Sequence, residues 1–217
     1  RLVLLDGPTG AGKTEVLGRL AARGVQALDL EGLANHRGSL FGAMPGGQPS
    51  QKLFESRLFD ALERLDPARP VVVEAESSKV GARSVPSRLW AAMGAAPRIG
   101  LRASVAARAA FSARAYAATA ADAEALERAF ARMPRHVSKA TLAEWRALAA
   151  AGDHLALAAA LIETHYDPAY RRSGGAAERM ATVDAGDLSD AALEAAADAV
   201  SNVMVSLPLI PAKAGTQ

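Results

Sequence analysis

The sequence contains no cysteine among its 217 residues. This absence excludes disulfides, thiolate metal ligands and cysteine nucleophiles within the chain. Aromatic residues make up only 5%, so the core must be built mainly from Ala, Val and Leu. No apolar run approaches the roughly 20 residues that a membrane-spanning helix needs, and no signal peptide is visible. We therefore expect a cytoplasmic protein that does not enter a membrane.

The sequence has little excess of either sign of charge, because its net charge is only +2. The positive and negative residues are nevertheless unevenly distributed along the chain. Between Arg98 and Arg146 there are eight Arg and one Lys against four acidic residues. Between Ala176 and Val200 there are six acidic residues against one Arg. These segments are either two solvated helix faces of opposite sign or, for the basic one, a surface for a polyanion such as RNA.

A glycine-rich loop stands near the start of the chain, where residues 4–20 read LLDGPTGAGKTEVLGRL. The loop matches the phosphate-binding pattern G-x-x-x-x-G-K-[ST], in which glycines let backbone N–H groups turn inward around an anion. Lys13 is expected to reach phosphate oxygens and Thr14 to hold Mg²⁺. A glycine turn without a ligand is the alternative. The expected phosphate-binding residues are Gly7, Pro8, Thr9, Gly10, Ala11, Gly12, Lys13 and Thr14.

Strand and helix patterns alternate over the first hundred residues. The expected strands are residues 1–6, 25–32, 69–77 and 97–103. This alternation predicts an α/β fold, with a P-loop NTPase-like parallel sheet, flanking helices and a C-terminal helical extension. From Ser104 onward the pattern is nearly all helical. We therefore expect an α/β core over residues 1–117, the helical extension over 118–203 and a disordered tail over 204–217.

Acidic residues follow two of the expected strands. Glu74 comes after three valines, at the strand end where ligands bind in open α/β sheets. Its expected roles are Mg²⁺ binding through water or general base catalysis, and the alternative is an ion pair with Arg. Asp29 and Glu31 end the second strand, where they either orient the following loop or bind a metal. That loop, residues 33–50, is long, and long loops in compact domains are often functional.

Residues 28–42, LDLEGLANHRGSLFG, are less generic than the phosphate loop. With that loop, they make the chain similar to the P-loop domain of the tRNA 2-selenouridine synthase family. The supporting stretches, in the family's order, are PSQKLFESRL, ARPVVVEAESSKVG, LWAAMGAAPRI and THYDPAYRRS. The resemblance spans residues 2 to about 173. The family's third-strand motif usually reads E-D-E-S, and Ala75 replaces its Asp here.

This resemblance implies a transferase that modifies 2-thiouridine at the wobble position, in the anticodon region of tRNA. The family transfers a geranyl group from geranyl diphosphate to the sulfur, and then replaces the S-geranyl group with selenium from selenophosphate. Its members carry a rhodanese-like domain with a Cys ahead of the P-loop domain. Because this chain starts with Arg1 and is in a strand by its second residue, we expect further residues upstream.

The resemblance also implies roles for individual residues. Lys13, Glu74 and Arg37 are the expected catalytic residues. Lys13 would stabilise charge on the leaving pyrophosphate, together with backbone N–H groups and Mg²⁺, and Arg37 would clamp phosphate. The expected substrate or RNA contacts are His36, Arg37, Glu76, Arg108 and Tyr170. The structural alternatives are loop hydrogen bonds for His36 and Arg37, a solvated helix face for Arg108 and packing for Tyr170.

Two other functions fit the same residues. A small-molecule or nucleoside kinase using ATP would have the same loop, and the stretch from Arg98 to Arg114 would supply the arginines of its lid. A non-catalytic tRNA-binding remnant would account for the absence of the rhodanese-like part. The intact GPTGAGKT stretch argues against such decay.

Overall fold

The computed structural model describes residues 1–75, 77–134, 137–172 and 178–206. Five parallel strands form one sheet in the order β2-β3-β1-β6-β7, and a short antiparallel hairpin, β4–β5, lies outside it. The strands of the sheet are β1 Leu2–Asp6, β2 Gln26–Leu28, β3 Val71–Glu74, β6 Arg98–Arg102 and β7 Ala181–Asp184. The hairpin strands are β4 Lys79–Val80 and β5 Arg83–Ser84. The α/β class with a parallel sheet is confirmed.

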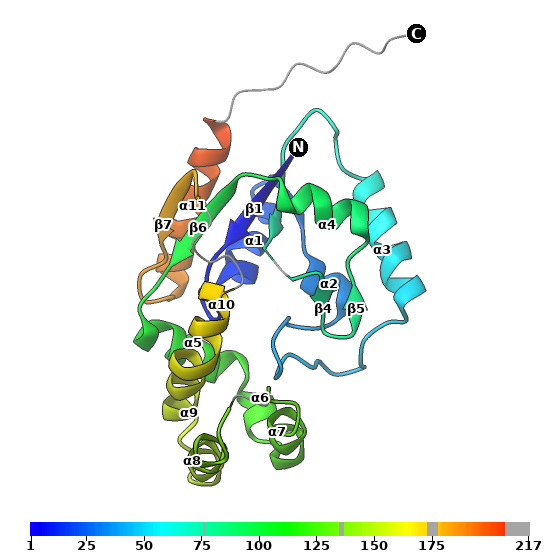
Figure 1. Ribbon diagram of the computed structural model, residues 1–217. Helices are drawn as coiled ribbons and strands as arrows, with labels where there is room; N and C mark the ends of the chain where they lie inside the picture. Colours follow the sequence, from blue (N-terminus) through cyan, green and yellow to red (C-terminus); the bar gives the residue numbers. More distant parts are fainter. Residues whose placement is uncertain (76, 135–136, 173–177, 207–217) are drawn as a thin grey trace.

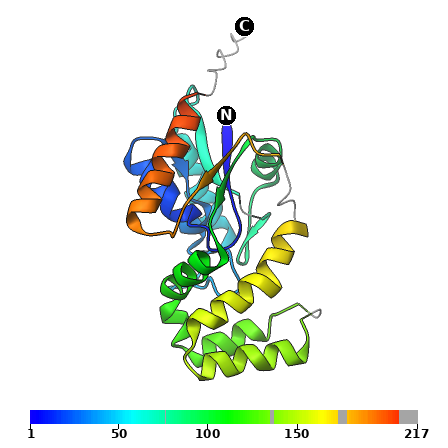
Figure 2. The same cartoon turned by 90° about the vertical axis from the view of Figure 1, so that its left-hand side faces the viewer.

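Helices cover both faces of the sheet and continue beyond its carboxyl edge (Figure 1). The helices packed on the sheet are α1 Lys13–Ala22, α2 Leu30–Ala34, α3 Gln51–Glu63, α4 Ser87–Gly94 and α11 Asp190–Val205. The helices beyond the edge are α5 Val105–Ala115, α6 Ala117–Ala120, α7 Ala123–Phe130, α8 Lys139–Ala150, α9 His154–Leu161, the π-helix η1 Ile162–Tyr166 and α10 Asp167–Arg172. Figure 2 shows α9, η1 and α10 as one rod (yellow) that rises from the helical layer towards the sheet.

Strand alternation divides the apolar residues of the sheet between two cores. Successive side chains of a strand point to opposite faces, so Val3 and Leu5 pack with α1 and α11. Leu4 packs on the other face, with α3 and α4. The neighbouring strand repeats this pattern, because Val72 joins the first core and Val73 the second. The sheet is thus buried on both faces, as expected for parallel strands.

The helical layer has a third core of its own. Trp145 of α8 is only 1% exposed, and its ring centroid lies 6.4 Å from that of Phe130 in α7. Phe41 meets Phe130 edge to face at 5.9 Å. Because Phe41 belongs to the long loop that follows α2, this contact fixes the loop against the helical layer.

The last part of the chain differs from the expected helical extension. β7 pairs in parallel with β6, from Ile99 opposite Ala181 to Arg102 opposite Asp184, and α11 packs in the core that contains α1. Residues 181–205 therefore complete the sheet, so the extension predicted over 118–203 is wrong at its C-terminal end. Of the expected tail, residues 204–206 are described, and α11 runs to Val205. The remainder, 207–217, lies outside the described residues.

The second strand also ends earlier than expected. β2 stops at Leu28, and Asp29 caps α2 by accepting a hydrogen bond from the Gly32 N–H at 2.7 Å. The prediction that strand two runs to residue 32 is wrong because this carboxylate satisfies an otherwise unpaired N–H at a helix start. The long loop therefore begins only after Ala34.

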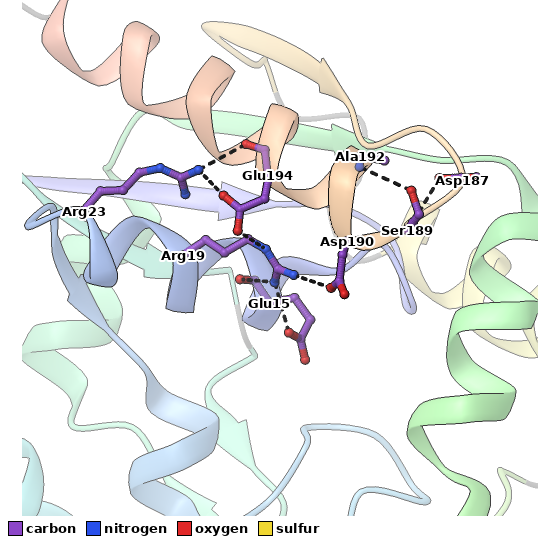
Figure 3. Close-up of polar contacts among 8 residues, drawn as sticks. All are labelled: Glu15, Arg19, Arg23, Asp187, Ser189, Asp190, Ala192 and Glu194. Atoms are coloured by element: carbon purple, nitrogen blue, oxygen red, sulfur yellow. Dashed lines mark hydrogen bonds and ion pairs between the residues drawn. The ribbon is translucent and has the colours of Figure 1, made fainter.

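Ion pairs join α11 to α1 (Figure 3). Arg19 contacts Asp190 at 2.8 Å and Glu194 at 3.0 Å. Arg23 contacts Glu194 as well, and Asp198 at 3.2 Å. Much of the acidic charge between residues 176 and 200 is thus paired with Arg19 of α1 and with Arg23, which caps the C-terminal end of that helix. Among the described residues, no helix has both the length and the apolar character required to cross a lipid bilayer.

Candidate phosphate-binding site

The glycine-rich loop joins β1 to α1 at the carboxyl end of the central strand. β3 and β2 lie on one side of β1, and β6 and β7 on the other, which makes this the switch point where open α/β sheets bind ligands. Gly10 and Gly12 have φ angles of 79° and 78°. A Cβ on Gly10 would lie 2.7 Å from Ser112 Oγ, and one on Gly12 would lie 2.8 Å from a methyl carbon of Leu193. Both positions therefore require glycine.

The first turn of α1 has the features of an anion site. No side chain caps the helix at Gly12, so its first N–H groups are not satisfied by a capping residue. Lys13 Nζ donates to the Gly7 carbonyl oxygen at 3.0 Å, which holds the ammonium group across the loop. Of the phosphate-loop residues predicted from the sequence, Gly7 and Thr9 to Thr14 line one cleft, and Pro8 does not.

Oxygen atoms gather around Thr14. Its hydroxyl lies 3.1 Å from Glu31 Oε2 and 3.3 Å from Glu74 Oε2, and Glu74 also accepts from the Glu31 N–H at 2.9 Å. Glu74 is fully buried. A hydroxyl and two carboxylates fit Mg²⁺, which prefers oxygen ligands and usually keeps several waters and substrate phosphates in its shell. The described residues contain no group of three or more His, Cys, Asp and Glu that would hold a metal alone.

Asp6 is a site residue that the sequence reasoning missed. Its carboxylate, 3% exposed, accepts hydrogen bonds from the Gly7 N–H at 2.8 Å and the Tyr170 hydroxyl at 3.0 Å. Arg179 also donates to it, at 3.0 Å. Burial, followed by the charge of Asp6, raises the pKa of Tyr170 from 10.0 to about 12. An Asp that ends an apolar strand directly before the first loop glycine was the available signal.

Arg108 supports the loop from the side of α5. Its guanidinium makes two bonds of 2.8 Å to the Asp167 carboxylate and a third, of 3.1 Å, to the Thr9 carbonyl oxygen. The residue is 3% exposed. This burial argues against the solvated helix face that was the structural alternative for Arg108, because Asp167 of α10 covers its charge.

A cleft of about 960 Å³ opens over the loop. The long loop after α2, helix α5 and the rod of η1 and α10 form its walls. Arg37 and Arg114 are exposed and line it. Arg37 donates to the Ala115 carbonyl oxygen and its guanidinium lies 5.3 Å from the centre of the Tyr116 ring. The cleft thus brings two guanidinium groups, those of Arg37 and Arg114, to the same space as the glycine-rich loop.

The other predicted contacts have different surroundings. His36 is buried, does not line the cleft, and accepts a hydrogen bond from the Gly38 N–H at 3.1 Å. Burial, and then the charge of Arg132, lowers the pKa of His36. Tyr170 lines the cleft, whereas Glu76 lies outside the described residues. The substrate contacts expected for His36, Glu76, Arg108 and Tyr170 remain predictions.

Most arginines of the basic segment are paired with carboxylates. The ion pairs are Arg98–Asp6, Arg102–Asp184, Arg108–Asp167, Arg128–Glu124 and Arg146–Glu127. Three of these acids lie outside the basic segment, so its excess of positive charge is smaller in the fold than in the sequence. Arg114 is the residue of this segment that is both exposed and on the wall of the cleft.

Comparison with known proteins gives consistent matches. A family model described as the tRNA 2-selenouridine synthase AAA domain matches residues 1–137. The tRNA 2-selenouridine synthase of Cupriavidus pinatubonensis is 45% identical over 104 residues, which are 47% of this chain and 27% of that protein. That of Pseudomonas syringae pv. syringae is 48% identical over 102 residues, 46% of this chain and 27% of the relative. That of Verminephrobacter eiseniae is 48% identical over 108 residues, 49% and 28% respectively. The match thus spans little more than a quarter of these curated relatives.

Proposed function

Because the chain belongs to the family of tRNA 2-selenouridine synthase AAA domains, we propose that it is the phosphate-binding part of a transferase that modifies wobble 2-thiouridine in tRNA. The observation that carries the proposal is the geometry of the loop. Gly10 and Gly12 adopt left-handed conformations beside Lys13, at the floor of a cleft of about 960 Å³. Such a cleft has room for a phosphorylated group donor and for a nucleotide of the acceptor.

The proposed group donors are geranyl diphosphate and selenophosphate, which are both anions. In geranyl transfer, the thiouridine sulfur attacks the first carbon of the geranyl group, and pyrophosphate leaves with the electrons of the broken C–O bond. Lys13 and the N–H groups of the loop stabilise the charge that grows on this leaving group. A thiocarbonyl sulfur is a good nucleophile without a strong base. This is consistent with Glu74, which is buried and already bonded by Thr14 and by the Glu31 N–H.

Thr14 would hold Mg²⁺ as a bound cofactor, with the carboxylates of Glu31 and Glu74 beside it. When bound, it would neutralise part of the phosphate charge. The role of Glu74 is then to hold the Thr14 hydroxyl and the start of α2 in place. Arg37, which lines the same cleft, would clamp a phosphate oxygen.

The proposed macromolecular partners are the anticodon region of tRNA and a rhodanese-like domain of the full-length enzyme. Arg37 and Arg114, exposed on the cleft walls, suit the phosphates of an RNA that brings its wobble base to the loop. The rhodanese-like domain would supply the cysteine that this chain lacks. It would take part in the replacement of the geranylated sulfur by selenium.

The test is the Lys13→Ala variant, assayed with geranyl diphosphate and thiolated tRNA. Loss of one charged donor at the leaving group should lower geranyl transfer by about 100-fold or more, while tRNA binding stays nearly the same. Lys52→Ala, which removes an exposed lysine of α3, is the control and should transfer at the wild-type rate. Unchanged transfer by Lys13→Ala would refute the role of the loop. A wild-type protein that binds tRNA and transfers nothing would instead indicate a non-catalytic remnant.

A further inference from the structure

An apolar hollow lies beside the phosphate cleft, among α5, α7, α9 and the long loop. Its volume is about 60 Å³. The large apolar side chains that line it are Phe41, Leu126, Leu157, Leu161 and Ile162, and the rings of Tyr116, His154 and Tyr166 complete the wall. Small residues of α5 and α9, Ala113 and Ala158, leave the space between these helices open.

The hollow and the phosphate cleft share part of their walls. The shared residues are Thr9, Ser39, Ser112, Tyr116 and Tyr166. Thr9 belongs to the glycine-rich loop itself. A ligand whose phosphates rest on the loop therefore has its remaining atoms next to an apolar space, which suits a molecule with an anionic head and a hydrocarbon tail.

Ser112 stands where the two spaces meet. It is 8% exposed, and its hydroxyl has no hydrogen-bond partner among the described residues. The hydroxyl faces the loop, because a Cβ on Gly10 would lie 2.7 Å from Ser112 Oγ. A buried hydroxyl without a partner is costly, and a phosphate oxygen held at the loop would remove that cost.

The π-helix η1 contributes to the same boundary. It runs from Ile162 to Tyr166, and these two end residues line the hollow. Tyr166 also lines the cleft. π-Helical turns are rare and occur often at functional sites, because the extra residue per turn redirects neighbouring side chains.

We propose that the hollow holds the terminal isoprene unit of an allylic diphosphate, and that Ser112 donates a hydrogen bond to the oxygen that links the diphosphate to the chain. This inference rests on the proposed function, in which such a diphosphate is the group donor. One water needs about 10–15 Å³ in the same measure of volume, so the hollow of about 60 Å³ has room for roughly four to six waters, about the bulk of one five-carbon unit. The first isoprene unit and the reacting carbon then stay in the open cleft, within reach of the tRNA sulfur.

The experiment compares the affinities of geranyl diphosphate and inorganic pyrophosphate by calorimetry, at one Mg²⁺ concentration. The wild-type protein should bind geranyl diphosphate at least tenfold more tightly than inorganic pyrophosphate. Ala113→Leu and Ala158→Leu, which fill the hollow from two different helices, should reduce this ratio to near one without changing the pyrophosphate affinity. Ala106→Leu, at an exposed position of α5, is the matched control and should keep the wild-type ratio.

A further variant, Ser112→Ala, should weaken the binding of both ligands severalfold and leave their ratio unchanged, because pyrophosphate places a terminal oxygen where geranyl diphosphate has its linking oxygen. Thermal unfolding without ligand verifies that each variant is folded. Equal affinities of wild type for the two ligands, or a tenfold ratio that persists in both filled variants, would overturn the inference. If such variants keep the ratio while geranyl transfer to tRNA proceeds, the proposed function stands and the position of the tail is wrong. If wild type binds neither ligand, both proposals fall.

Discussion

At the scale of single residues, Asp6 is the point where distant parts of the chain meet the glycine-rich loop. The Tyr170 hydroxyl and the Arg179 guanidinium, 164 and 173 residues away in sequence, both donate to its carboxylate. The same carboxylate holds the Gly7 N–H. The start of the loop is thus fixed by a side chain of α10 and by one that lies shortly before β7, so the conformation of the loop depends on most of the chain being folded.

The Asp6→Asn variant tests this dependence. An amide carries no charge to pair with Arg179, and its NH₂ group cannot accept from the donors that surround it. We expect the free energy of unfolding, measured by urea denaturation, to fall by about 3 kcal/mol. Asp184→Asn is the matched control, because Asp184 ends β7, is exposed and pairs with an exposed arginine. Asp184→Asn should leave the free energy of unfolding in urea nearly unchanged. Equal effects of the two variants would contradict the role given to Asp6.

At the scale of elements, the glycine-rich loop could be predicted from the sequence but β7 could not. The loop is a local pattern, since its glycines and Lys13 act through neighbouring backbone atoms. The four residues of β7, ATVD, lie near alanine-rich helices and form a strand because β6 pairs with them. Likewise, nothing local links Arg108 to Asp167, or Asp6 to Tyr170, because each pair forms only when the elements pack.

Leu193 tests whether α11 belongs to the core that supports the loop. This residue is 3% exposed, and its side chain packs so close to Gly12 that a Cβ there would lie 2.8 Å from a Leu193 methyl carbon. Leu193→Ala should lower the free energy of unfolding by about 2–4 kcal/mol, because it removes buried methyl groups and leaves a cavity. Val205→Ala, at an 83% exposed position of the same helix, should change it by less than about 0.5 kcal/mol. A similar small effect of both substitutions would place α11 outside the cooperative core.

At the scale of the whole molecule, the phosphate cleft lies where the sheet meets the helical layer. The sheet side contributes the glycine-rich loop, Asp6 and the oxygen atoms gathered around Thr14. The side of the helical layer contributes α5, η1 and α10, which line the cleft. Many of the charged side chains form ion pairs, whereas two arginines on the cleft wall are exposed. Acidic residues of α11 pair with α1, most arginines between Arg98 and Arg146 pair with acids, and Arg37 and Arg114 remain exposed on the cleft.

This distribution predicts how tRNA binding responds to salt. The affinity for tRNA should fall as salt is raised, because cationic side chains displace counterions from phosphates. Arg114→Gln should reduce the slope of log affinity against log salt by about 1. Arg88→Gln, which removes an exposed arginine of α4 away from the cleft, should keep the wild-type slope. An affinity that does not change between low and moderate salt would argue against RNA contact at this surface.

The central claim is that the glycine-rich loop holds the phosphates of a group donor for tRNA modification. Thermal unfolding with geranyl diphosphate and, separately, with ATP–Mg²⁺ tests it most directly. A ligand that binds only the native state raises Tm once its concentration exceeds Kd. We predict that geranyl diphosphate raises Tm and that Lys13→Ala abolishes the rise. Stabilisation by ATP–Mg²⁺ but not by geranyl diphosphate would contradict the claim and indicate a kinase.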